Sequence, residues 1–186
     1  MREIVFFLEE ESAKAMLQTL LPRIVGEAVH PRFVVFEGKQ DLHRKLEKKL
    51  SGYLNPSARF IVIRDQDNDD CKKVKRSLKS ICHKAGHPDA IVRIACRELE
   101  SFYLGDLRAV ELGLEIRGVA AKQSKAKYRK PDELHTPYKE LCILTGNRYK
   151  KIAGSRSIAR HLNIEAPGSD SFRHLLSAIR KCFALG

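Results

Sequence analysis

Short apolar runs alternate with longer amphipathic stretches over the first hundred residues of this chain. Four runs have the length and composition of buried β-strands: residues 4–8, 33–36, 60–63 and 91–95. Between them, apolar residues recur at helical spacing in three stretches, Ala13–Leu21, Leu42–Leu54 and Val74–Ala85. Ser12 stands where its side chain can cap the first of these helices. Because strands joined by helices favour right-handed crossovers, the pattern predicts an α/β fold: a mainly parallel four-stranded sheet with helices on both faces.

The pattern changes beyond Leu104. Residues 117–160 contain twelve lysines and arginines against three acidic residues, and their glycines and prolines indicate loops and short helices. A final amphipathic helix is expected near Ser171, with an apolar face made of Phe172, Leu175, Leu176, Ile179 and Phe183. We therefore expect an α/β core over residues 1–104 and a basic, mostly helical and loop-rich extension over 105–186, packed on that core as one compact domain.

Composition narrows the class of protein. Of the 186 residues, 43% are hydrophobic, which is enough for a folded core and too many for a disordered chain. No apolar run is long enough to cross a bilayer and the first residues do not resemble a secretory signal, so we expect a cytoplasmic protein with no membrane partner. Its five cysteines are expected to be reduced. The net charge of +12 favours a polyanionic partner, of which nucleic acid is the commonest.

Acidic residues of this basic chain gather where predicted strands end. Residues 9–11 follow the first strand, residues 65–70 follow the third, and Glu98 and Glu100 follow the fourth. The carboxyl ends of parallel strands meet at one edge of a sheet, where ligands bind in such folds. Helix dipoles alone would explain one such cluster, but three clusters on one edge repel each other unless a cation lies among them. Carboxylate oxygens are ligands that Mg²⁺ prefers, so the pattern favours a magnesium site.

Two other metals fit the spacing poorly. Asp65, Asp67 and Asp69 begin like an EF-hand loop, but Asp70 stands where that loop needs glycine and Arg76 where it needs glutamate. Four candidate zinc ligands match no zinc-finger spacing: Cys71, Cys82, His83 and His87.

A strand ending in glutamate, followed later by a strand ending in Asp-x-Asp, resembles the Toprim domain of topoisomerases, bacterial primases and overcoming-lysogenization-defect (OLD) nucleases. Glu9 takes the place of the Toprim glutamate, and Asp65 and Asp67 that of its aspartate pair. The chain also resembles an uncharacterised bacterial family of small stand-alone Toprim-like proteins, often encoded beside an AAA- or ABC-type ATPase. Segments that carry this resemblance are EEESAKAML, GKQDL, RDQDNDDC, RIACRELESFYLGD and GSRSIA. Glu10 departs from the pattern, since Toprim domains usually have glycine there.

The resemblance implies the nuclease branch of Toprim proteins, because the partner domains of topoisomerases and primases are missing. It implies a phosphodiesterase that depends on Mg²⁺ or Mn²⁺, with Glu9, Asp65, Asp67 and Glu98 as catalytic residues. The same four and Glu100 would bind one or two metal ions. Glu9 is expected to be a further ligand or a general acid or base. Glu98 is preferred to Glu100, because Glu100 lies on the same face as Glu98 only if the strand continues past them, and points away if a helix has begun.

Basic residues have a part in this scheme. The side chains expected to hold a nucleic-acid backbone are Lys39, Lys127, Arg129, Lys150, Lys151 and Arg156. Gly154-Ser155-Arg156 resembles a phosphate-contacting turn, although a plain loop fits it equally well. The lysines and arginines of residues 72–79 are interpreted as a solvated outer helix face.

Two alternatives stay open. In the first alternative to the nuclease, the chain is a regulatory subunit of a neighbouring ATPase in anti-phage defence, with a degenerate Toprim site. In the second, it is a nucleic-acid-binding module without chemistry. A homodimer is compatible with both, because Phe102–Leu104 and the terminal helix suit a core or an interface equally.

Overall fold

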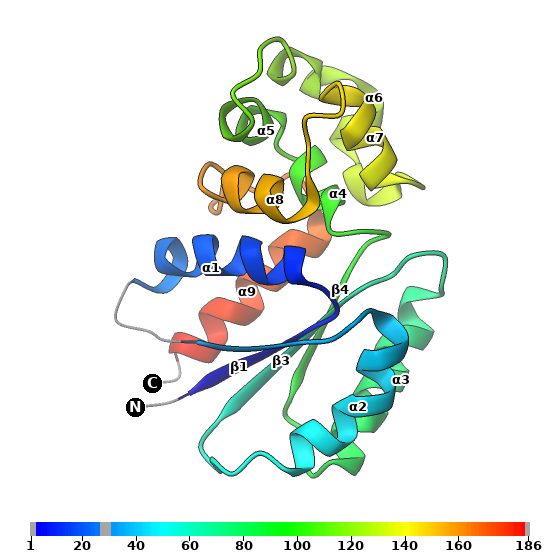
Figure 1. Cartoon of the computed structure of the whole chain (residues 1–186), viewed down its shortest axis with the longest axis vertical. Coiled ribbons are helices and arrows are strands. Elements are labelled where there is room, and N and C mark those ends of the chain that lie inside the picture. The colour runs from blue at the N-terminus through cyan, green and yellow to red at the C-terminus, as the bar shows by residue number, and fades with distance from the viewer. Residues whose placement is uncertain (1–2, 27–30, 185–186) are drawn as a thin grey trace.

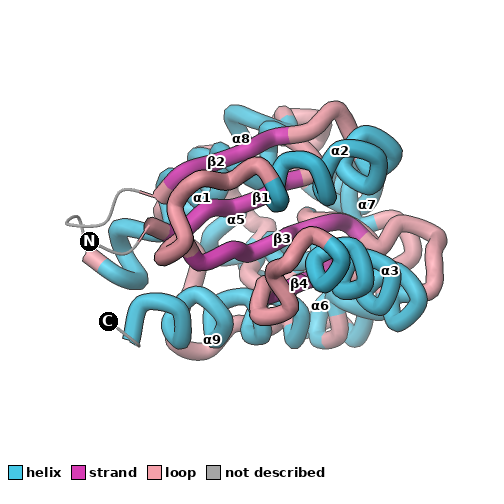
Figure 2. Tube along the Cα trace, turned by 90° about the horizontal axis from the view of Figure 1, so that it is seen from below, coloured by secondary structure: helices cyan, strands magenta, loops and turns pink. Residues whose placement is uncertain are grey.

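A four-stranded parallel sheet forms the centre of the computed structural model, which describes residues 3–26 and 31–184. Its strands are β1 (Ile4–Leu8), β2 (Arg32–Val35), β3 (Arg59–Asp65) and β4 (Ile91–Ala95). They lie in the order β2-β1-β3-β4, which Figure 2 shows, and every neighbouring pair is parallel. The predicted α/β class and the four predicted strands are confirmed, and the fold is consistent with a Toprim-like sheet.

Helices cover both faces of the sheet (Figure 1). One face carries α1 (Glu11–Val25) and α9 (Asp170–Ala184), with α8 (Lys151–Ala159) packed on α1, and the other face carries α2 (Lys39–Ser51) and α3 (Cys71–Lys84). Alternate residues of a strand point to opposite faces. Phe6 and Leu8 of β1 therefore join one apolar core, and Val5 and Phe7 join the other.

Short helices follow β4, as the glycines and prolines predicted. They are α4 (Glu100–Leu104), α5 (Leu107–Gly113), η1 (Ala120–Ser124), α6 (Ala126–Arg129), η2 (Pro131–Glu133) and α7 (Pro137–Leu144). Their apolar side chains join the same core as β1 and α1: Val110, Tyr128 and Leu141 belong to one cluster with Phe6. Residues on both sides of Leu104 thus share a core.

Two local expectations are wrong. Ser12 lies inside the first turn of α1 and donates to the carboxylate of Glu10, so it does not cap that helix. Helix α2 ends at Ser51, and the side chain of Leu54 beyond it is 96% exposed. Of the two alternatives left open for Phe102–Leu104, the core is confirmed, because all three side chains are enclosed in the chain's own core.

Among the residues that the structure describes, no helix is both long and apolar enough to cross a membrane.

Candidate active site at the carboxyl edge of the sheet

Glu9 and Asp65 meet where the strand order reverses. From β1 the chain moves to β2 on one side and then returns to β3 on the other, so the carboxyl ends of β1 and β3 flank the topological switch point of the sheet. Asp65 is the last residue of β3, and its backbone N–H donates to Oε2 of Glu9 at 3.0 Å. The two predicted site residues are thus adjacent, although they are 56 positions apart in the chain.

Cations hold the outer part of this cluster. The guanidinium of Arg64, only 4% exposed, lies 2.5 Å from Oδ2 of Asp69 and 3.8 Å from Oε2 of Glu9. Lys39, at the start of α2, lies 2.9 Å from Oδ2 of Asp67. Its hydrogen bond to Asp67 raises the pKa of Lys39. Asp67 and Lys39 therefore satisfy each other's charge.

A second group of charges includes a residue from the far end of the chain. Lys151, in the first turn of α8, pairs with Oε2 of Glu10 at 2.9 Å. Partial burial by itself would lower the pKa of Lys151. The hydrogen bond to Glu10 and the charges of Glu10, Glu100 and Asp65 outweigh burial and raise this pKa. Burial raises the pKa of Asp65 well above its usual range, and the charges of Glu100, Glu10 and Glu9 add to the effect.

Glu100 is the most enclosed carboxylate of the cluster, with 0% of its surface exposed. Its Oε1 accepts a hydrogen bond from the Tyr149 hydroxyl at 2.9 Å. Since that hydroxyl donates to Glu100, the contact of 3.2 Å between Tyr149 and Ser155 has Ser155 as donor. Oε2 of Glu100 has no partner among the described residues. Burial raises the pKa of Glu100 to about 7, against the opposing effects of Lys151 and Tyr149.

Glu98 lies outside the cluster. Its Oε2 accepts a hydrogen bond of 2.6 Å from the backbone N–H of Tyr138, in the first turn of α7. Strand β4 ends at Ala95, and Arg97 then takes a left-handed conformation with φ of 61°. The strand alternation that would have placed Glu98 and Glu100 on one face is therefore broken, and the preference for Glu98 is corrected in favour of Glu100.

The predicted backbone-binding residues fall into two groups. Lys39 and Lys151 pair with the cluster, and Lys127 pairs with Glu140 at 2.6 Å. The other three, which are exposed and form no ion pair within the described part of the chain, are Arg129, Lys150 and Arg156.

Gly154-Ser155-Arg156 is neither a turn nor a loop, because it lies in the interior of α8. A Cβ atom on Gly154 would lie 2.5 Å from Cδ2 of Tyr149, so the glycine leaves room for that ring. The neighbouring serine then reaches the Tyr149 hydroxyl. The motif thus serves to position Tyr149 beside Glu100.

Carboxylates outnumber cations in this cluster. Six carboxylates gather there against three cations, so the negative charge is only partly offset; the carboxylates are Glu9, Glu10, Asp65, Asp67, Asp69 and Glu100 and the cations are Lys39, Arg64 and Lys151. The oxygen donors and the unpartnered buried Oε2 of Glu100 suit Mg²⁺. In residues 3–26 and 31–184, however, no three acidic, cysteine or histidine side chains already converge on one metal position.

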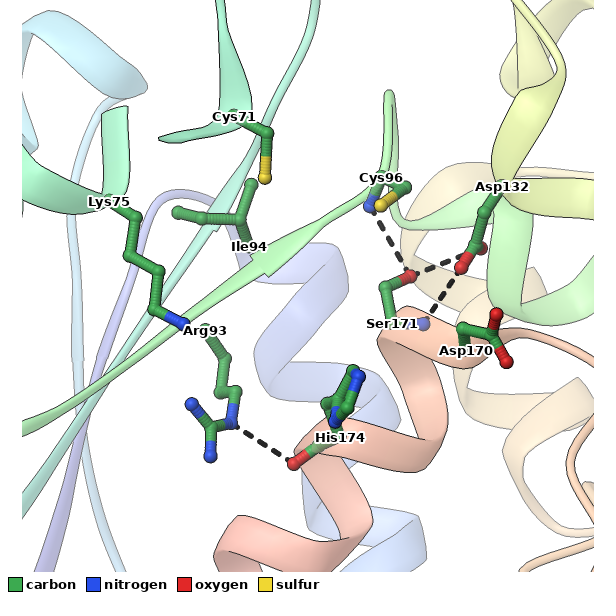
Figure 3. Close-up of a pocket in the computed structure, with 9 residues that line it drawn as sticks. All are labelled: Cys71, Lys75, Arg93, Ile94, Cys96, Asp132, Asp170, Ser171 and His174. Atoms are coloured by element: carbon green, nitrogen blue, oxygen red, sulfur yellow. Dashed lines mark hydrogen bonds between the residues drawn. The ribbon is translucent and has the colours of Figure 1, made fainter. Parts of the chain in front are cut away.

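A separate cavity of about 520 Å³ lies at the free edge of β4, between α3 and α9 (Figure 3). None of the cluster's carboxylates lines it. Asp132 in its wall accepts hydrogen bonds from the backbone N–H and the hydroxyl of Ser171. Burial raises the pKa of the Cys96 thiol in the same wall to about 11, so this cysteine is not a nucleophile at neutral pH.

Comparisons with known proteins give one result. No curated protein and no solved structure matches this chain. The model of a family described as a domain of unknown function, DUF4276, matches residues 8–180, which is nearly the whole chain and includes both halves of the carboxylate cluster. The chain therefore belongs to the DUF4276 family.

Proposed function

We propose that this protein is a nuclease-like phosphodiesterase of the Toprim type, which acts on nucleic acid and depends on Mg²⁺ or Mn²⁺. One observation carries the proposal. Glu9, Asp65 and Glu100 gather at the switch point of a parallel sheet, and one buried oxygen of Glu100 has no partner there among the described residues. A buried carboxylate oxygen without a donor is costly unless a cation or a proton reaches it.

Asp65, Glu9 and Glu100 are the residues that would hold the metal, with Asp67 after release from Lys39. When bound, the metal would polarise a phosphodiester and lower the pKa of a water molecule. The exposed end of Lys151, which Glu10 now holds, would contact a phosphate oxygen. The alternative role for Glu9, if it is not a ligand, is proton exchange with the attacking or leaving oxygen, which its pKa, raised by burial, would suit.

A second candidate function has its own support. Lys39, Arg64 and Lys151 already offset part of the acidic charge, and Glu10 stands where Toprim domains have glycine. These features favour a degenerate site in a nucleic-acid-binding or regulatory subunit, which would work with an ATPase, for instance in anti-phage defence.

Calorimetric titration with Mg²⁺ and Mn²⁺ tests the first proposal. We expect stoichiometric binding by the wild-type chain and none by Asp65→Ala/Asp67→Ala. The matched control is Glu47→Ala/Asp89→Ala, which removes two exposed carboxylates far from the cluster and should bind as the wild type does. Supercoiled and single-stranded DNA and RNA then serve as substrates. Absence of both binding and cleavage in the wild-type chain would contradict the first candidate and favour the second.

A further inference from the structure

The outer layer of the molecule formed by α2 and α3 carries a large positive charge. The two helices contain eleven lysines and arginines against two acidic residues, a net charge of +9, while the whole chain has +12. They pack against each other on one side of the sheet (Figure 1), and their apolar side chains point inward. We call the exposed surface of these helices the α2–α3 face.

Most of this charge has no counter-ion among the residues that the structure describes. Arg44 and Lys45 share the carboxylate of Asp41. Within the described residues, no ion pair involves the exposed side chains of Lys48, Lys49, Lys72, Lys73, Lys75 and Arg76. Like charges held side by side repel, so the folded state loses stability by keeping them together. A polyanionic partner would remove that cost.

The dimensions and side chains of the face select among polyanions. Each helix is about 20 Å long, a length over which a nucleic-acid duplex presents roughly twelve phosphate charges. Neither helix has a phenylalanine, tyrosine or tryptophan on which unpaired bases could stack, which disfavours single strands. The buried apolar residues leave the two helices nothing to insert into a lipid surface.

We propose that the α2–α3 face binds the phosphate backbone of a nucleic-acid duplex. The choice of partner class rests on the proposed function, but such binding needs no cleavage. Both helices begin at the carboxyl edge of the sheet, where Lys39 opens α2 beside Asp67 and Asp70 caps α3. A duplex lying along this face would therefore pass the carboxylate cluster.

Fluorescence anisotropy with a 20-base-pair DNA duplex and an RNA duplex of the same length tests the inference, in EDTA so that no cleavage occurs. Compared with the wild type, Lys72→Gln/Lys73→Gln/Arg76→Gln should bind both at least tenfold more weakly near 100 mM salt. The slope of log K against log salt should fall by about 2 to 3, since each lost phosphate contact removes about 0.9. A second variant, Lys48→Gln/Lys49→Gln, probes α2 independently and should change the slope by about 2.

The matched control is Arg117→Gln/Arg160→Gln/Lys181→Gln, which removes three exposed cations on the opposite side of the sheet. It should keep the wild-type affinity and slope. Wild-type affinity in both face variants, or equal losses in face and control variants, would overturn the inference. So would binding to vesicles of anionic lipid, lost in the face variants, without binding to either duplex. Loss of metal binding in the earlier titration would leave this result unaffected, so the two proposals fail separately.

Discussion

Gly154 lies inside a helix, where glycine normally destabilises by about 1 kcal/mol relative to alanine. The structure offers a reason for its presence, because the ring of Tyr149 occupies the space that a Cβ atom would need. The hydroxyl at the far end of that ring donates to Glu100. One missing methyl group thus fixes the position of a hydrogen bond to the most buried carboxylate of the site.

Gly154→Ala should therefore destabilise the protein, against the direction that helix propensity predicts. Overpacking against Tyr149 should lower the free energy of unfolding by about 1 to 3 kcal/mol, measured by urea denaturation. Ala153→Gly, at the exposed neighbouring position, is the matched control and should cost about 1 kcal/mol through propensity alone. A gain in stability for Gly154→Ala would contradict the packing argument.

Glu100 should make stability depend on pH. Its pKa is about 7 in the folded protein and near 4.5 when unfolded, so between these values the folded state binds more protons. The free energy of unfolding therefore falls as the pH rises from the unfolded-state pKa to the folded-state pKa, by at most about 3 kcal/mol. At pH values below both pKa values, this residue does not change the free energy of unfolding. In Glu100→Gln the loss of unfolding free energy between pH 4.5 and 8 should shrink accordingly.

Urea denaturation in EDTA at the two pH values gives this difference directly. Glu47→Gln, which removes an exposed carboxylate from α2, is the control and should keep the wild-type pH dependence. An unchanged difference in Glu100→Gln would mean that the buried carboxylate does not hold its proton up to neutral pH.

At the scale of elements, helix α7 begins with a cap that comes from a distant segment. Glu98 accepts the N–H of Tyr138 from 40 positions away. Unpaired N–H groups at a helix start are stabilised by such acceptors, typically by about 1 kcal/mol. The carboxylate thus connects the end of β4 to the basic extension.

Glu98→Ala should lower the free energy of unfolding by about 1 kcal/mol and leave the metal affinity unchanged. Thermal denaturation and calorimetric titration measure the two effects. Glu133→Ala is the control, because its pair with Lys130 is exposed and contributes little. Loss of metal binding in Glu98→Ala would show that Glu98 belongs to the metal site after all.

The elements themselves are largely predictable from the sequence. Apolar runs such as residues 60–63 are buried on both faces of a parallel sheet, so they produce a strong and unambiguous signal. Site residues directly at strand ends, Glu9 and Asp65, follow from the same logic. The choice between Glu98 and Glu100 depends on the backbone turn at Arg97, and the role of Gly154 on a contact with Tyr149; neither leaves a local pattern.

At the scale of the molecule, the extension completes the core of the first hundred residues. Helix α8 packs along α1, and α9 packs on α1 and β4. Apolar residues of these two helices, among them Ile158, Leu175 and Leu176, share one core with α1, so their removal would expose apolar surface of the first hundred residues to water.

A fragment of residues 1–104 should therefore not fold on its own. We expect helical circular dichroism without a cooperative unfolding transition, together with binding of the dye ANS, which reports exposed apolar surface. The full chain, measured in parallel, should unfold cooperatively and bind little dye. Cooperative unfolding of the fragment would show that its sheet is stable without α8 and α9.

The ion pair between Glu10 and Lys151 can form only after translation has added both residues. The two residues are 141 positions apart, so at about 5 to 20 residues per second a ribosome adds the lysine roughly 7 to 28 seconds after the glutamate. Throughout that interval a nascent chain lacks the cation that α8 contributes to the carboxylate cluster. If the finished protein cuts nucleic acid with the help of Lys151, a growing chain lacks that side chain until most of its messenger RNA has been translated.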